Sequence, residues 1–238
     1  MRNYNSPRGP VFFSTARSPC AYIKGQFERR IVTELDSLTG SKLHSELSLL
    51  GFRRSHKSLY KPVCETCQEC VAVRVLALNF KLSKSQKRIV SKNRDLSVFQ
   101  VDPEASTEHF KVFSDYQASR HAGGGMSKMS FIQYKAMVEE TEIDTQIVEF
   151  REPSGRLVSA LLVDHVENGF SAVYSFFEPK LSKFGLGNFL IIQCLLYGKK
   201  NKYKYLYLGY YISKISSMSY KSRFKPGQIL ENNEWKNV

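Results

Sequence analysis

Four cysteines could together hold a metal, because three of them stand at two-residue gaps and a fourth lies upstream. They are Cys20, Cys64, Cys67 and Cys70. Four thiolates bind zinc or an iron–sulfur cluster. The short Cys-x2-Cys-x2-Cys spacing lacks the second, well-separated pair usual in structural zinc sites, so reduced thiols at a tight turn are the alternative. Cys194 stands in an apolar run and is expected in the core, and an odd cysteine count argues against a disulfide framework.

These cysteines are accompanied by a strongly basic stretch, from residue 51 to residue 95. It holds eleven Lys and Arg residues but only three acids, and Phe52, Tyr60 and Phe80 stand between the cations. Cations interleaved with aromatic rings are what a polyanion with stackable bases requires. A solvated basic face is the alternative explanation of the charge.

Polar residues in the more apolar second half are candidates for proton transfer and anion binding. Asp164 stands in the run LLVDHV, and a buried carboxylate needs a partner or a role. Tyr174 lies on the next predicted strand, where core packing with a satisfied hydroxyl is the alternative. The glycine turn at residues 183–187 precedes an apolar helix, whose free N–H groups could hold a phosphate. There the alternative is a tight turn that needs small residues.

The hydrophobic pattern predicts the elements that must position these candidates. In the first half it predicts a helix over 40–50 that ends at Gly51, an extended piece over 52–63, a strand over 71–78 and a basic helix over 83–96. In the second half it predicts helices over 107–122 and 130–140, strands over 145–152, 156–166 and 169–179, an apolar helix after the glycine turn and a strand over 203–212. The tail from 213 to 235 is expected to be irregular. This order indicates an α+β or α/β arrangement in which antiparallel hairpins precede a βαβ crossover.

Size and charge narrow the function classes. The chain has 238 residues, 42% of them apolar, which suits a globular protein with a sizeable core. The formal net charge of +13 favours an anionic partner such as nucleic acid, a membrane surface or an acidic polypeptide. No apolar run approaches the ~20 residues that span a bilayer, and the N-terminal segment lacks the apolar run of a secretory signal. A cytosolic protein without a membrane partner is therefore expected.

Several segments in a fixed order resemble one enzyme family. They are GFRRSHKSLYKPVCETCQECVAVRV, FKLSKSQKR, SAVYSFFEP, LGYYI and MSYKSRFKP. From Pro19 to Pro226 the chain resembles the aminoacyl-tRNA–protein transferases, and most of all their short bacterial branch, the aspartate/glutamate leucyltransferases. The eukaryotic arginyltransferases have a Cys-x-x-Cys near the N-terminus, whereas here Ile23 follows Cys20 by three residues. This departure favours the leucyl branch and weakens the case for an iron–sulfur cluster.

The resemblance implies a fold, a reaction and partners. The fold is a small cysteine-containing domain over residues 1–100, followed over 101–238 by a mixed-sheet domain similar to the N-acetyltransferases (GNAT). The reaction moves leucine from leucyl-tRNA to the N-terminal Asp or Glu of a protein and marks that protein for degradation. The ester donor is already activated and the nucleophile is the acceptor's own amine. No cofactor is therefore required, and zinc or an iron–sulfur cluster at the cysteines stays an open question.

Within that reaction the candidate residues take three roles. A bidentate cation is the natural reader of an acceptor carboxylate, and the candidates are Arg53, Arg54, Arg74, Lys84 and Arg88. The tRNA end and backbone are assigned to Lys183, Gly185, Gly187, Lys199, Lys200 and Lys202. Asp164 and Tyr174 are the candidates for proton transfer.

Three other functions stay open at this stage. An arginyl-tRNA–protein transferase would use the same elements with another donor. A small-molecule acetyltransferase would bind acetyl-CoA at the glycine turn, although it would not need the basic first domain. A non-catalytic RNA- or metal-binding module would explain the charge and the cysteines, but not Asp164 and Tyr174 on inner strands.

Overall fold

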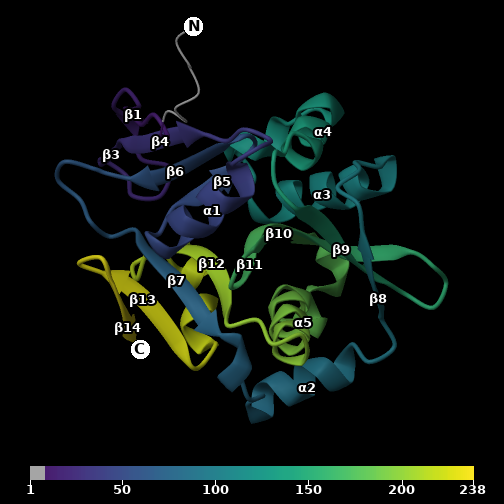
Figure 1. The fold of residues 1–238 in the computed structure, drawn as a ribbon. Helices are drawn as coiled ribbons and strands as arrows, with labels where there is room; N and C mark the ends of the chain where they lie inside the picture. Colours follow the sequence, from purple (N-terminus) through teal and green to yellow (C-terminus); the bar gives the residue numbers. More distant parts are fainter. Residues whose placement is uncertain (1–8) are drawn as a thin grey trace, which may run out of the picture.

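The structure, a computed structural model, describes residues 9–238 (Figure 1). Residues 1–8, the beginning of the segment that was expected not to be a secretory signal, lie outside the described residues. The helices are α1 (Gly40–Leu49), α2 (Lys84–Lys92), α3 (Thr107–Arg120), α4 (Phe131–Glu139) and α5 (Leu186–Lys200). The strands are β1 (Phe13–Ser14), β2 (Ser18–Pro19), β3 (Phe27–Glu28), β4 (Arg30–Glu34), β5 (Arg53–Ser55), β6 (Ser58–Pro62), β7 (Val71–Leu76), β8 (Ser97–Val101), β9 (Thr145–Arg151), β10 (Leu157–Val166), β11 (Gly169–Phe177), β12 (Tyr205–Tyr211), β13 (Gly227–Glu231) and β14 (Glu234–Asn237).

Eight strands form one large mixed sheet, in the order β14-β13-β7-β12-β11-β10-β9-β8. β11 and β12 pair in parallel with α5 between them in the chain, and β8 to β11 pair antiparallel. Phe189 and Leu190 of α5 pack on one face of this sheet, and Phe113 of α3 and Tyr134 of α4 pack on the other. Hairpins therefore precede a βαβ crossover, and the predicted mixed α+β fold class is confirmed.

A smaller sheet of β1, β4, β6 and β5 forms the N-terminal part and lies with α1 above the large sheet in Figure 1. Leu47 of α1 packs there against Phe52 and Leu59. The two parts are not consecutive in the sequence. β7, which precedes residue 100, lies inside the large sheet between β13 and β12. Strands from both sides of residue 100 therefore share that sheet.

Two turns illustrate how local sequence sets these boundaries. α1 ends as predicted at Gly51, whose φ of +84° is the left-handed conformation that glycine adopts most readily. The tail over 213–235 was predicted to be irregular, and this is wrong from residue 227 onward, where β13 and β14 form a hairpin. Asn232 and Asn233 have φ values of 52° and 61°, which fits a tight hairpin turn that the sequence reading overlooked.

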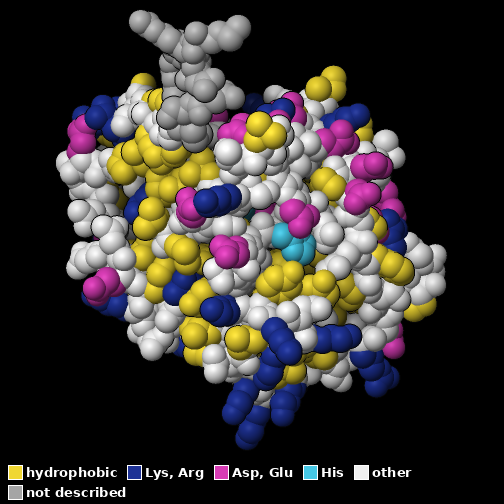
Figure 2. Space-filling view, in the orientation of Figure 1, with side chains coloured by type: hydrophobic (Ala, Val, Ile, Leu, Met, Phe, Trp, Pro, Cys, Tyr) yellow, Lys and Arg dark blue, Asp and Glu magenta, His cyan; other side chains and the backbone are white. Residues whose placement is uncertain are grey.

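Basic side chains are concentrated at one end of the molecule. Figure 2 shows Lys and Arg gathered over α2, at the lower edge of the face in view. α2 exposes Lys84, Lys87 and Arg88, while Ile89 and Val90 pack on the core beneath. Among residues 9–238, none of the helices combines the length and apolar character needed to cross a membrane.

Candidate active site

The large sheet opens where β11 and β12 stop pairing. Their register runs from Gly169 opposite Tyr205 to Ser171 opposite Tyr207. Farther along, β11 continues to pair with β10, and β12 with β7. The β10–β11 register also shifts between residues 162 and 163 of β10, where β11 has the extra residue Val173, and the β7–β12 register shifts between residues 207 and 209 of β12. Such irregularities concentrate near active sites, and we call this opening, residues 171–174 with 207–210, the fork.

Arg53 of β5 reaches into the fork from the smaller sheet. Its Nη1 donates to Oγ of Ser171 at 2.7 Å, and its Nη2 donates to the main-chain oxygen of Ala172. A Cβ atom on Gly209 would lie 3.2 Å from Nε of Arg53, and Gly209 has φ +77°. A glycine on β12 therefore leaves the space in which this buried guanidinium lies.

Lys221 of η4 (Ser216–Arg223) lies on the β12 side of the fork. Its Nζ donates to the main-chain oxygen of Tyr210 at 2.5 Å. Burial, and then the charge of Arg53, lower the pKa of Lys221 to about 7. Burial also raises the pKa of the neighbouring Tyr220 to about 12. Lys221 can therefore lose and regain a proton near neutral pH, a property that no sequence pattern had indicated.

The predicted tRNA residues divide between the two ends of α5. At its start Gly185 is left-handed, with φ +72°, and α5 has no side-chain cap there. A Cβ on Gly187 would touch the Phe177 ring at 3.4 Å, and Nζ of Lys183 stands 5.4 Å from the Phe184 ring centre.

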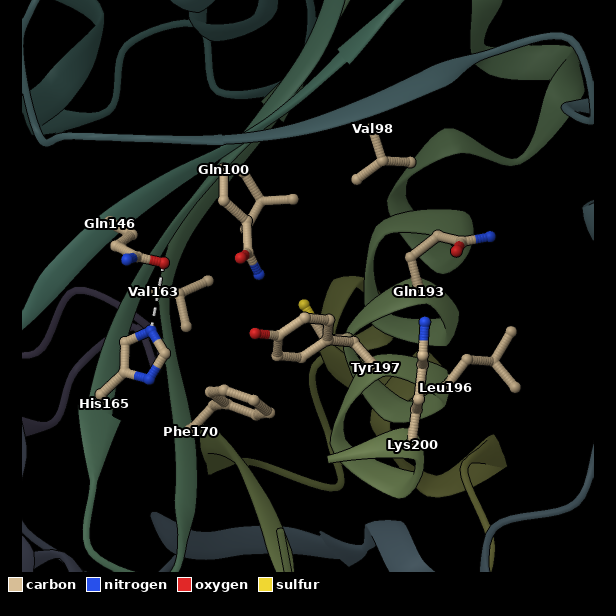
Figure 3. A pocket seen from close by; sticks show the side chains of 12 residues that line it. Val98, Gln100, Gln146, Val163, His165, Phe170, Gln193, Leu196, Tyr197 and Lys200 are labelled. Atoms are coloured by element: carbon tan, nitrogen blue, oxygen red, sulfur yellow. Dashed lines mark hydrogen bonds between the residues drawn. The ribbon is translucent and has the colours of Figure 1, made fainter. Parts of the chain in front are cut away.

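Lys199, Lys200 and Lys202 follow at the far end of α5. Nζ of Lys199 donates to the main-chain oxygen of Phe80 at 3.0 Å, and Lys202 lies in the following turn with φ +63°. Lys200 lines a cavity of about 430 Å³ beside α5 (Figure 3).

The predicted acceptor readers are dispersed. Lys84 and Arg88 are exposed on α2, at the opposite end of Figure 1 from β5. Arg74 of β7 is buried, with its guanidinium carbon 3.7 Å from the Tyr205 ring centre and 4.1 Å from that of Trp235. Its Nε also donates to the side chain of Gln228 at 2.8 Å. Of the five readers, Arg53 donates to Ser171 and Ala172 in the fork, and the guanidinium carbon of Arg74 lies 6.0 Å from the Tyr207 ring centre at its β12 edge. All five roles stay predictions.

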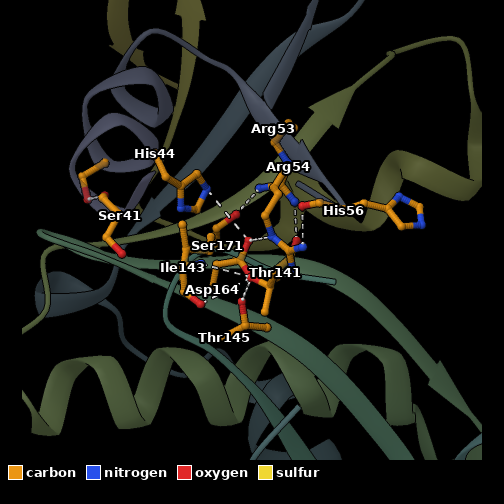
Figure 4. Close-up of polar contacts among 12 residues, drawn as sticks. Ser41, His44, Arg53, Arg54, His56, Thr141, Ile143, Thr145, Asp164 and Ser171 are labelled. Atoms are coloured by element: carbon orange, nitrogen blue, oxygen red, sulfur yellow. Dashed lines mark hydrogen bonds and ion pairs between the residues drawn. The ribbon is translucent and has the colours of Figure 1, made fainter. Parts of the chain in front are cut away.

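Arg54 and Asp164 are brought together as a buried ion pair (Figure 4). Nε and Nη2 of Arg54 donate to the two carboxylate oxygens of Asp164 at 2.7 and 2.8 Å. Thr145 adds a hydrogen bond of 2.9 Å to the same carboxylate. Both charges are fully enclosed, so each is satisfied by the other, and the pair joins β5 of the smaller sheet to β10 of the larger one.

His44 of α1 completes this buried contact. Its Nε2 lies 3.9 Å from Oδ2 of Asp164, and neither ring nitrogen has a hydrogen-bond partner within the described residues. Burial lowers the pKa of His44 to about 4, and the charge of Asp164 only partly opposes that shift. The ring is therefore neutral at physiological pH.

Tyr174 lies on the α3 side of the sheet. Its hydroxyl oxygen accepts a hydrogen bond from the side-chain amide of Gln117, and its ring packs on Phe113 at 5.9 Å between centres. Burial raises the pKa of Tyr174. The side chain therefore has the satisfied hydroxyl of the core-packing alternative, and its role in proton transfer stays a prediction.

The four predicted metal ligands line one cavity of about 590 Å³ between the smaller sheet and β7: Cys20, Cys64, Cys67 and Cys70. Burial, and then the nearby Cys64 and Cys20 thiols, raise the pKa of Cys70 to about 11. The Cys70 thiol therefore keeps its proton near neutral pH while no metal is bound, and a metal would displace that proton on binding. Among the residues described, no three His, Cys, Asp or Glu side chains are grouped as a metal site would need. The metal site at these four cysteines therefore stays a prediction.

Comparison with known proteins identifies the family. Residues 18–88 and 108–231 match two family models described as "Arginine-tRNA-protein transferase", N terminus and C terminus. A protein of Gluconacetobacter diazotrophicus named "Aspartate/glutamate leucyltransferase" is 43% identical over 98% of this chain and 90% of its own length. One of the same name from Paramagnetospirillum magneticum is 42% identical over 99% and 97%. The chain belongs to the aminoacyl-tRNA–protein transferase family. The family resemblance is confirmed, and the protein is a transferase whose donor is an aminoacyl-tRNA.

Two solved structures align with much of this chain at low sequence identity. "Crystal structure of FemX" aligns with 79% of this chain and 64% of its own at 9% identity, with a TM-score of 0.48. "The structure of L-PGS from Bacillus licheniformis" aligns with 78% and 54% at 14% identity, with a TM-score of 0.47.

Proposed function

We propose that the protein transfers leucine from leucyl-tRNA to the N-terminal amine of proteins that begin with Asp or Glu, and so marks them for degradation. The names of its relatives support this donor and these acceptors. The observation that carries the proposal is the pair of cationic side chains, buried Arg53 and half-buried Lys221, at the fork of an aminoacyl-tRNA transferase fold. Such a site can bind the carboxylate of an acidic chain end and can accept and return a proton.

Lys221 is our candidate for the proton-accepting group. The acceptor amine attacks the ester carbonyl of the donor, a C–N bond forms, and the C–O bond to the tRNA ribose breaks. The attacking nitrogen gives up a proton, and the ribose oxygen takes one. An amine of pKa about 7 can carry that proton from one to the other. Asp164 is held on both oxygens by Arg54, so Lys221 replaces it in this proposal.

Arg53 is our candidate for reading the acceptor's acidic side chain. Its guanidinium donates hydrogen bonds to Ser171 and Ala172. A guanidinium has five N–H donors, so others are left to bind a carboxylate. Lys84 and Arg88 are exposed beside α5 and are better placed to contact tRNA phosphates than an acceptor at the fork. We therefore assign them to the tRNA, with Lys183, Gly185 and Gly187 at the start of α5.

A transfer assay tests the proposal directly. Purified protein is incubated with leucyl-tRNA carrying labelled leucine and with three peptides that differ only in a first residue of Asp, Glu or Ala. Label is expected on the Asp and Glu peptides and at least tenfold less on the Ala peptide. Parallel reactions contain arginyl-tRNA or acetyl-CoA. Preferred transfer of arginine, or acetylation of the peptides, would overturn the proposed donor.

A further inference from the structure

A cavity that the proposed reaction does not use lies on the α5 face of the large sheet. Gln100 of β8, Gln146 of β9 and His165 of β10 line it from the sheet side (Figure 3). Gln193 and Tyr197 line it from α5. The volume of about 430 Å³ is within the range of small-molecule sites.

The lining combines amides with aromatic rings. In Figure 3 the hydrogen bond drawn joins Nε2 of His165 to Oε1 of Gln146, at 3.2 Å, and the amides of Gln100 and Gln193 make none with the other side chains drawn. The Phe170 and Tyr197 rings lie 5.6 Å apart between centres, and Tyr197 is 36% exposed. Amides pair with the edges of nucleobases, and exposed aromatic rings stack on their faces.

The surroundings of the cavity are cationic. Lys200 lies on its wall, and α2, which packs against α5, exposes Lys84, Lys87 and Arg88. Figure 2 shows this basic group directly below the apolar surface in front of α5. A phosphate backbone that followed these cations would bring its bases to the cavity.

We propose that this cavity reads one unpaired base in the acceptor end of the donor tRNA, an inference that rests on the proposed function. The proposed function places the end of the tRNA at the start of α5, whose first residue is Leu186. Leu196 on the cavity wall lies ten residues farther along the helix, which is about 15 Å at the helical rise per residue. The base is therefore nearer the stem than the nucleotide that carries the amino acid. The leucine side chain is a worse occupant, because it would cover the Gln100 and Gln193 amides without offering either a hydrogen bond.

Hairpin RNAs provide the test. Four hairpins reproduce an acceptor stem with an unpaired four-nucleotide 3′ tail and differ only in the tail base next to the stem. The full-length protein is expected to bind one of them roughly tenfold or more tightly than the others, the discrimination of one good base contact. Gln100→Met and Gln193→Met keep the side-chain volume and remove the amide, and each is expected to reduce that preference at least threefold. Lys87→Ala is the control, and it should weaken binding of all four hairpins by the same factor.

Each outcome decides the matter. Equal affinity of the wild-type protein for the four hairpins would overturn the base-reading inference, as would glutamine variants that weaken all four equally. If leucine is transferred normally while the hairpins bind equally, this inference fails and the proposed function stands. If the protein neither binds the hairpins nor transfers leucine, both fail.

Discussion

Lys221 is the residue whose ionisation should control the rate. If its neutral form accepts the proton, kcat/KM for an Asp peptide rises with pH through about 7, in addition to the ionisation of the peptide amine near pH 8. Lys221→Met should lose the lower ionisation and about 10²- to 10⁴-fold of kcat/KM. The measurement is a pH profile of both proteins with leucyl-tRNA held saturating. A variant that keeps both ionisations would exclude Lys221 as the base.

The lowered pKa of Lys221 also predicts how the stability of the protein depends on pH. The folded pKa of Lys221 is about 7 and its ordinary value is 10.5, so the unfolded chain binds more protons between those pH values. The free energy of unfolding contributed by this group therefore rises with pH from 7 to 10.5. Lys221→Met should be more stable than wild type at pH 7, and that advantage should shrink at pH 10. Urea unfolding at the two pH values measures the difference.

The Arg54–Asp164 pair should matter for stability more than for chemistry. Asp164→Ala leaves the Arg54 guanidinium buried without its partner, and this should cost about 3–5 kcal/mol in free energy of unfolding. The double variant Arg54→Met with Asp164→Leu removes both charges and should recover most of that loss. Urea unfolding of the three proteins tests this. A loss below 1 kcal/mol in Asp164→Ala would mean that water reaches the pair, and Asp164 would again be a candidate for proton transfer.

At the residue scale, the sequence could indicate which side chains deserved attention but not their surroundings. Asp164 was expected to need a partner or a role and was assigned to proton transfer; in the structure it is paired with Arg54, which had been assigned to the acceptor. Arg53 and Arg54 are neighbours in sequence, yet strand alternation sends one to the fork and the other to Asp164. Lys221 was missed because its low pKa arises from burial, which no spacing of residues reveals.

At the element scale, β12 must have glycine where Arg53 passes it. Gly209→Ala places a side chain at φ +77° and 3.2 Å from Nε of Arg53, so stability should fall by about 1–3 kcal/mol and kcat/KM for Asp peptides at least tenfold. Gly155→Ala is a matched control, because Gly155 has φ +86° with open space around its Cβ. It should lose similar stability and keep its activity. Equal activity losses in both variants would show that strain, and not Arg53, is responsible.

The order of elements could largely be predicted, and their pairing could not. The sequence patterns located helices α1 to α5 and the strands β9 to β12 of the described residues, although α2 was predicted from its basic, polar character and not from apolar periodicity. They could not show that β7 pairs with β12, some 130 residues later in the chain, because pairing partners leave no local pattern. The C-terminal hairpin was missed although Asn232–Asn233 is a turn signal, because the flanking strands are short.

On the scale of the whole molecule, a net charge of +13 acts through its uneven distribution. Exposed cations gather over α2, while the fork holds buried Arg53 and half-buried Lys221. Two anionic substrates can therefore be bound at separate places, the tRNA over α2 and α5 and the acidic chain end at the fork. This division predicts that charge changes on α2 affect only one of the two substrates.

The double variant Lys84→Ala with Arg88→Ala tests that division. It should weaken tRNA binding and reduce the slope of log Kd against log salt by about 2, one for each phosphate contact removed. KM for the Asp peptide should stay unchanged, since α2, which carries both residues, lies at the opposite end of Figure 1 from β5. The control removes two exposed cations at the other end of the molecule, Lys42 of α1 and Lys135 of α4, and should leave the slope unaltered. A rise in peptide KM without a change in the salt slope would return Lys84 and Arg88 to the acceptor site.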